Sequence, residues 1–122
     1  MMKHILKLFV LATLCAALTL AAAAATETGS CGTGLTYTLD TETGVMTISG
    51  EGWLGQPQTK NKKAVRTLVI AEGVKKIQMS AFHGYTELRS VTLPTTLDFV
   101  ASYAFAYCPR LEAVHIRSLA DF

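Results

Sequence analysis

Residues 65–87 read VRTLVIAEGVKKIQMSAFHGYTE, and residues 88–110 read LRSVTLPTTLDFVASYAFAYCPR. The two segments align over 23 residues without a gap, and a partial third copy continues through residues 111–122. Apolar residues recur at the same positions of each unit, at a spacing that fits neither a helix of period 3.6 nor one long strand of period 2. A tandem repeat of this length predicts a solenoid, in which every unit forms one turn of a coil.

Each unit predicts a short strand followed by a bend. Strand-like alternation occupies residues 68–70 and the equivalent positions of the next two copies, and Pro94 ends the second strand because proline lacks the N–H that a ladder needs. We expect a helical turn or tight bend at 80–82 and its equivalent, which places Phe82 directly over Phe105. Because one unit cannot bury both its faces alone, the copies must stack. The predicted fold is therefore a mainly β repeat solenoid of about 2.5 repeats with short helical turns.

The segment 26–64 precedes the repeats and predicts an N-terminal cap. Alternating apolar residues on either side of a turn indicate a β-hairpin: Leu35, Tyr37 and Leu39, then Met46 and Ile48. Because two strands alone are marginally stable, we expect the hairpin to cover the first edge of the solenoid. Residues 50–64 are rich in Gly, Gln and Lys and predict a loop. Its lysines at 60, 62 and 63 fit either a solvated loop or a contact with a polyanion or the cell wall.

Residues 1–25 differ in composition from the rest of the chain. They contain two lysines and no carboxylate, and an apolar run ends in five alanines. These are the features of a secretory signal peptide cleaved near Ala25. The alternatives are an uncleaved membrane anchor over residues 8–25, or a lipoprotein acylated at Cys15, against which Leu14 argues. We expect export to the cell surface or medium, with no stable membrane span after cleavage.

Charge and cysteine content exclude several classes of protein. After residue 25 the chain carries nine Lys and Arg against nine Asp and Glu, so a globally basic nucleic-acid binder is not expected. Cys31 and Cys108 then remain, too few for a structural zinc site. In an oxidising compartment they form either one disulfide or two buried free thiols.

No enzymatic motif emerges. After the leader the chain has only His83 and His115, at non-equivalent repeat positions and without an acid or nucleophile at a recognisable spacing. A glycine-rich phosphate loop before a helix is missing from the sequence, and so are paired carboxylates. The sequence predicts no catalysis, no cofactor and no metal site.

The repeat resembles a known family. The pattern L-P-x-x-L-x-x-V-x-x-x-A-F-x-x-C-x-x-L-x-x-V-x-I, read from Leu93 through Ile116, is similar to the 23-residue leucine-rich repeats of BspA-like bacterial surface proteins. The segments GSCG, LTYTLD and MTISGEG resemble the N-terminal segment of that family. The resemblance implies a right-handed leucine-rich-repeat coil and a secreted or cell-surface, non-enzymatic role in adhesion. It also implies that Tyr85 and Cys108 share an inward packing position, which favours free thiols.

The strand register predicts an outward face. If Leu68 and Ile70 point inward, their neighbours point outward, and Arg66, Arg89 and Glu112 stack on one line at a spacing of 23 residues. An ordinary solvated sheet face is the alternative. The candidate protein-binding residues are Arg66, Thr67, Val69, Arg89, Ser90, Thr92, Glu112 and His115.

The predicted function is an exported adhesion or protein-interaction module whose partner is a host matrix or bacterial surface protein. The alternative is a structural, envelope-associated protein or a truncated remnant of a longer adhesin, without a specific ligand. A third hypothesis is a carbohydrate-binding module that uses Trp53 and Tyr37, although a single tryptophan beside such a hairpin is more often packing material. The last repeat lacks a polar cap, which fits a truncated chain or fragment, self-association through that end, or a strong dependence on the N-terminal segment.

Overall fold

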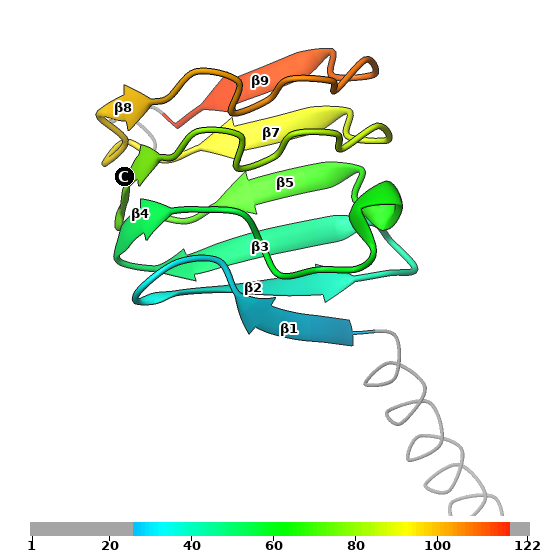
Figure 1. Ribbon diagram of the computed structural model, residues 1–122, viewed down its shortest axis with the longest axis horizontal. Helices are drawn as coiled ribbons and strands as arrows, with labels where there is room; N and C mark the ends of the chain where they lie inside the picture. Colours follow the sequence, from blue (N-terminus) through cyan, green and yellow to red (C-terminus); the bar gives the residue numbers. More distant parts are fainter. Residues whose placement is uncertain (1–25, 118–122) are drawn as a thin grey trace, which may run out of the picture.

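A computed structural model describes residues 26–117 (Figure 1). The predicted signal peptide at 1–25 and the last five residues of the partial repeat lie outside the described residues. The strands are β1 (Thr26–Ser30), β2 (Leu35–Asp40), β3 (Val45–Gly50), β4 (Gly52–Leu54), β5 (Thr67–Ile70), β6 (Val74–Ile77), β7 (Ser90–Leu93), β8 (Phe99–Val100) and β9 (Ala113–Ile116). A single 3-10 turn at Lys62–Ala64 is the only helical element of the described chain.

The strands form two sheets on the walls of one coil. The larger sheet has six strands in the order β1-β2-β3-β5-β7-β9, and the smaller has three in the order β4-β6-β8. Pairing is antiparallel from β1 to β3 and parallel in the rest of both sheets. Figure 1 shows each turn crossing from the large sheet to the small one and returning. The predicted mainly β solenoid is therefore confirmed.

The strand register follows the 23-residue repeat. Thr67 pairs with Ser90 and Ser90 pairs with Ala113, each one repeat further along the chain. In the small sheet Lys76 pairs with Phe99 at the same spacing. Each residue of a repeat thus lies directly above its equivalent in the preceding turn.

Stacked apolar side chains fill the coil. Leu68, Ile70 and Val91 are buried, as the alternation in the sequence predicts. The rings of Phe82 and Phe105 stack with centroids 5.5 Å apart and planes 11° from parallel. The predicted placement of the two phenylalanines is confirmed.

The bends that carry these phenylalanines are tight turns, the second of the two forms expected at 80–82 and its equivalent. Ser80 and Tyr103, one repeat apart, have φ of 59° and 60° in the left-handed region, which interrupts a right-handed helix. The backbone instead bonds to the next turn of the coil: Phe82 N–H donates to the Ala104 carbonyl at 2.8 Å.

The N-terminal segment contains the predicted hairpin and two further strands. β2 and β3 form the hairpin, and β3 pairs in parallel with β5, so the hairpin covers the first repeat as expected. β1 extends the hairpin on its outer side. The predicted loop at 50–64 contains β4, because Trp53 and Leu54 pair with the first strand of the small sheet in the repeats.

Both cysteines are free thiols. Cys31 is buried, and burial raises its pKa to about 11. Cys108 is half-buried, and its Sγ–H donates to the Phe82 carbonyl at 3.2 Å. Tyr85, its equivalent one repeat earlier, is buried beside Phe82. The free-thiol interpretation is correct.

The turn at Gly84 provides a test of this corner geometry. Gly84 has φ +80°, and a Cβ there would have no neighbouring atom within 4 Å, so its substitution changes conformation and not packing. We predict that Gly84→Ala lowers the free energy of unfolding by about 1 kcal/mol in urea titrations. Gly55→Ala is the matched control, because its Cβ would make only ordinary contact, at 3.7 Å from Gln78 Nε2. Equal effects of the two substitutions would contradict the left-handed geometry.

The Glu27 side chain connects β1 to the rest of the coil through hydrogen bonds, and its ionisation makes the stability of the fold depend on pH. The Tyr37 hydroxyl donates to its Oε1 at 2.6 Å, and the Asn61 amide donates to its Oε2. Burial raises the pKa of the Glu27 carboxyl, but hydrogen bonds from Thr59, Tyr37 and Asn61 outweigh burial and hold the pKa below its ordinary 4.5. A lowered folded pKa means that the ionised carboxylate stabilises the fold at higher pH, and that this contribution is lost as the pH falls through the lowered value.

We therefore predict that Glu27→Gln lowers stability at neutral pH and flattens the loss of stability on acidification below pH 4.5. Urea unfolding across that range measures both effects. Glu42→Gln, at an exposed position in the turn between β2 and β3, serves as the control. An unchanged acid limb in Glu27→Gln would show that the carboxylate has no such role.

Candidate functional site

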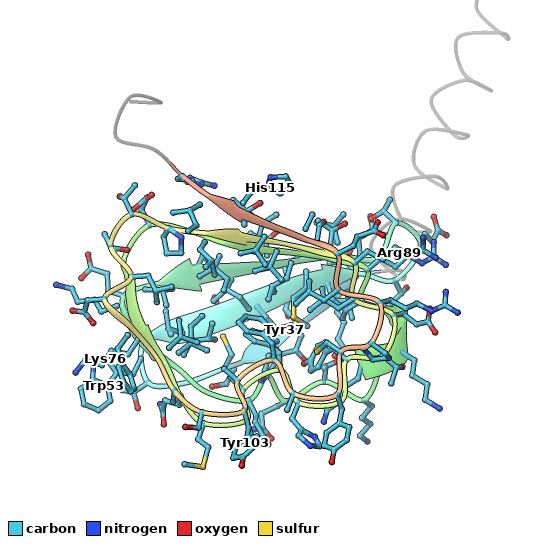
Figure 2. The ribbon with its side chains drawn as sticks, turned by 90° about the horizontal axis from the view of Figure 1, so that it is seen from above. Tyr37, Trp53, Lys76, Arg89, Tyr103 and His115 are labelled. Atoms are coloured by element: carbon cyan, nitrogen blue, oxygen red, sulfur yellow. The ribbon has the colours of Figure 1, made fainter. Side chains whose placement is uncertain are left out.

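The large sheet presents a polar outer face in the predicted register. One row of paired residues runs across β3, β5, β7 and β9 and consists of Thr47, Val69, Thr92 and His115. Each has some solvent exposure, whereas the alternating residues Leu68 and Val91 are buried. Figure 2 shows His115 on the outside of this sheet and Tyr37 inside the coil. The predicted outward register is confirmed.

The arginine line lies at the corner where the strands of the large sheet begin. Arg66 N–H donates to the Gly44 carbonyl at 2.8 Å, Arg89 N–H donates to the Arg66 carbonyl at 2.8 Å, and Glu112 N–H donates to the Arg89 carbonyl at 3.0 Å. These backbone bonds hold the three side chains on successive turns. Arg66 and Arg89 are exposed, so their guanidinium groups are available to a partner.

A cavity at this corner adds residues that the sequence analysis missed. It has a volume of about 620 Å³, and its lining comes from the hairpin turn and two successive repeats: Thr43, Arg66, Thr67, Glu87, Arg89 and Arg110. Arg110 Nη1 lies 3.4 Å from Glu87 Oε2, in an ion pair whose side chains are both solvent-exposed. Each of these two residues is the last of its repeat, so the 23-residue spacing could have predicted that Glu87 and Arg110 lie on adjacent turns.

A second hollow continues the site along the coil. It has a volume of about 350 Å³ and is lined by Arg89, Pro109, Arg110, Leu111 and Glu112. Arg89 and Arg110 line both hollows and join them into one surface, which we call the arginine corner: Thr43, Arg66, Thr67, Glu87, Arg89, Arg110 and Glu112. Three guanidinium groups face two carboxylates there, so the corner carries an excess of positive charge.

The arrangement suits carboxylate recognition. Guanidinium groups present paired N–H donors that match the two oxygens of a carboxylate. Only Glu87 is in ion-pair contact with an arginine of the corner, which leaves Arg66 and Arg89 without a salt bridge among the described residues. The corner therefore offers two guanidinium groups without a salt bridge, on backbone positions one strand spacing apart, about 4.8 Å.

The eight predicted binding residues divide between two places. Arg66, Thr67, Arg89 and Glu112 line the arginine corner. Ser90 pairs with Thr67 beside it. Val69, Thr92 and His115 lie further along the strands on the sheet face. Figure 2 shows this separation between Arg89 and His115.

Trp53 lies at the opposite corner, on the small sheet (Figure 2). Its side chain is 55% exposed, so the prediction that it serves as packing material is wrong. The Lys76 ammonium lies 4.7 Å from the centre of the indole, and both residues border a hollow of about 340 Å³ next to Phe99. Tyr37 is buried and bonded to Glu27, so Trp53 and Tyr37 do not form the hypothesised sugar platform.

The histidines occupy unrelated environments. His83 packs edge-on against Tyr107 with ring centroids 4.8 Å apart, and His115 lies on the sheet face. Within residues 26–117 there is no group of three His, Cys, Asp or Glu side chains that would hold a metal ion. The same part of the chain contains no helix with the length and apolarity to span a membrane.

Comparisons with known proteins agree with this architecture. The family described as "BspA type Leucine rich repeat region (6 copies)" matches residues 58–121. The fold is similar to the crystal structure of a leucine-rich repeat protein from Eubacterium ventriosum, with a TM-score of 0.68 and 21% sequence identity. That similarity covers 75% of this chain and 26% of the Eubacterium protein. No curated protein shows significant sequence similarity to the chain. The chain belongs to the BspA-type leucine-rich repeat family.

Proposed function

We propose that this chain is a secreted or cell-surface adhesion module, without catalytic activity, that binds an acidic segment of a protein partner at the arginine corner. The leucine-rich-repeat family supports a protein-interaction role. The observation that carries the proposal is the cavity of about 620 Å³ lined by three arginines of two successive repeats. The partner is a host matrix protein or a protein of a bacterial surface, reached after export by the signal peptide predicted at residues 1–25.

Electrostatics favours an acidic partner over a neutral one. Like charges one strand spacing apart repel, so Arg66 and Arg89 each gain when a carboxylate lies between them. An exposed ion pair contributes only about 0–1 kcal/mol, which means that a single contact is insufficient. Several guanidinium groups, held side by side by backbone hydrogen bonds, can form several ion pairs with one partner. Together these pairs contribute more binding free energy than a single pair.

The rest of the predicted surface extends the contact. Ser90 and Thr92 of β7, with Val69 of β5, continue from the corner onto the sheet face. Their short side chains provide hydroxyl donors and acceptors beside apolar surface at little cost in side-chain entropy. A partner strand or loop that spans both regions would form ion pairs at the corner and hydrogen bonds on the sheet face.

The second candidate function is a structural, envelope-associated role or that of a remnant of a longer adhesin, without a specific ligand. It predicts that the arginine corner is an ordinary solvated surface. The two candidates therefore differ in one measurable property, which is whether binding depends on the arginines.

We predict that Arg66→Ala combined with Arg89→Ala weakens capture of an immobilised matrix or bacterial surface protein about tenfold or more, which corresponds to about 1.4 kcal/mol. Binding of the unsubstituted protein should also weaken as salt is raised, because exposed charges are screened. Surface plasmon resonance against a panel of such proteins measures both effects.

The matched control is Lys60→Ala combined with Lys63→Ala, which removes the same charge from exposed residues that line neither hollow of the corner. Circular dichroism verifies that both variants fold. Equal binding by the two double variants would remove the arginine corner as the contact, and absence of salt-dependent binding to any member of the panel would favour the second candidate.

A further inference from the structure

An irregularity in the small sheet places Trp53 beside Lys76. Gly52 of β4 pairs with Val74 of β6, but Trp53 pairs with Lys76, so the register shifts between the two residues and passes over Lys75. A bulge of this kind changes the direction of the side chains next to it. The Lys76 ammonium lies 4.7 Å from the centre of the indole ring, and Figure 2 shows both side chains on the outside of the coil.

An apolar hollow opens next to this pair of residues. Its volume of about 340 Å³ lies at the lower end of the range of small-molecule sites, which is about 300–1,000 Å³. Its polar lining residues are Lys76 and Gln78, and its apolar ones are Trp53, Ile77, Met79, Phe99 and Ala101. A largely apolar wall with a few polar groups is the usual composition of a small-molecule site.

Large apolar side chains on this outer face are in contact with water. Trp53, Met79 and Phe99 are 55%, 64% and 54% exposed. Trp53 and Phe99 lie on either side of Lys76 in one row across β4, β6 and β8. An exposed apolar patch bordered by polar residues often marks a binding site, because a ligand that covers the patch removes apolar surface from water.

The charge at the hollow comes from Lys76. No carboxylate of residues 26–117 lies within salt-bridge distance of its ammonium. The indole holds the ammonium through a cation–π interaction, which fixes its position but leaves its charge without a counter-ion. On the other side of Trp53 a second hollow has a polar lining that includes Thr33 and Gln78. Trp53 therefore separates an apolar surface from a polar one, with a positive charge beside it.

We propose that the apolar hollow binds an amphipathic carboxylate such as a fatty acid, with the acyl chain against Met79 and Phe99 and the carboxylate at the Lys76 ammonium. The Gln78 amide makes one long hydrogen bond, 3.5 Å from its Nε2 to the Trp53 carbonyl, so it is available to the same ligand. A sugar would leave its hydroxyl groups without partners at the apolar wall, and a neutral lipid would leave the ammonium without a counter-ion. The site lies on the small sheet, and the proposal does not depend on the arginine corner.

The test follows the fluorescence of Trp53, the single tryptophan of the chain. Decanoate is added to the full-length protein below the concentration at which it forms micelles. We expect a saturable shift of the emission to shorter wavelength, because the acyl chain excludes water from the indole. Decanol has the same chain without the charge, and it should bind about fivefold more weakly, which is the effect of one ion pair at a partly exposed site.

Substitutions separate the two parts of the site. Lys76→Gln should weaken decanoate about fivefold and leave decanol unchanged. Lys75→Gln is the matched control, because Lys75 carries the same charge on the same strand but lines neither hollow, and it should bind decanoate normally. Phe99→Ala should weaken both ligands, because it removes part of the apolar wall. Arg66→Ala combined with Arg89→Ala should bind decanoate normally, which distinguishes this site from the arginine corner.

Three results would overturn the proposal. The first is the absence of a saturable shift with decanoate. The second is equal weakening by Lys75→Gln and Lys76→Gln, which would indicate a general attraction of anions. The third is a shift of Trp53 emission by phosphatidylglycerol vesicles but not by decanoate, which would indicate a membrane contact. If circular dichroism shows that Phe99→Ala does not fold, Met79→Ser replaces it, because Met79 borders the same hollow and is largely exposed.

Discussion

Inward side chains of the large sheet are buried where strands lie on both sides of their own, and this dependence on stacking governs the rest of the structure. Leu68 lies between Met46 and Val91 in adjacent strands, and the ring of Phe82 lies on that of Phe105. Adjacent strands are about 4.8 Å apart, so each layer is one side chain thick. A turn without neighbours has no second apolar surface on which to fold. The fixed repeat length follows, because a single inserted residue would move the inward set of that turn to the outside.

The same stacking determines the surface. Residues 23 positions apart in the sequence become neighbours, which places Arg66 beside Arg89 and brings Glu87 to Arg110. Each turn also repeats the exposed positions of the last one, so a favourable contact can be extended along the coil. Among the described residues, inward side chains such as Leu68 and Val91 are buried where strands lie on both sides of them.

The repeat identified the inward positions, the strand register and the phenylalanine stack, because apolar residues recurring at a fixed spacing have few alternative explanations. Other features depend on tertiary contacts that local sequence does not reveal. The segment that forms β1, TETGS, has no apolar alternation, and Glu27 anchors it through Tyr37 and Asn61. The left-handed conformation at Ser80 could not be predicted from the sequence, because the residue there is not a glycine. At the site, the 23-residue spacing could have identified Arg110 as a neighbour of Glu87. Thr43 lies outside the repeat, and only the hairpin turn brings it to the corner.

The most direct test of stacking is residue-level hydrogen exchange on Leu68→Ala, which removes one buried side chain from the middle layer. A cavity of this kind costs about 2–5 kcal/mol. If the layers form one cooperative core, the opening free energies of amides in β3 and in β7 should fall by the same amount, equal to the global loss measured in urea. If β3 or β7 retains its original protection while the other loses it, the turns are stable independently of one another, which would contradict the dependence of the fold on stacking.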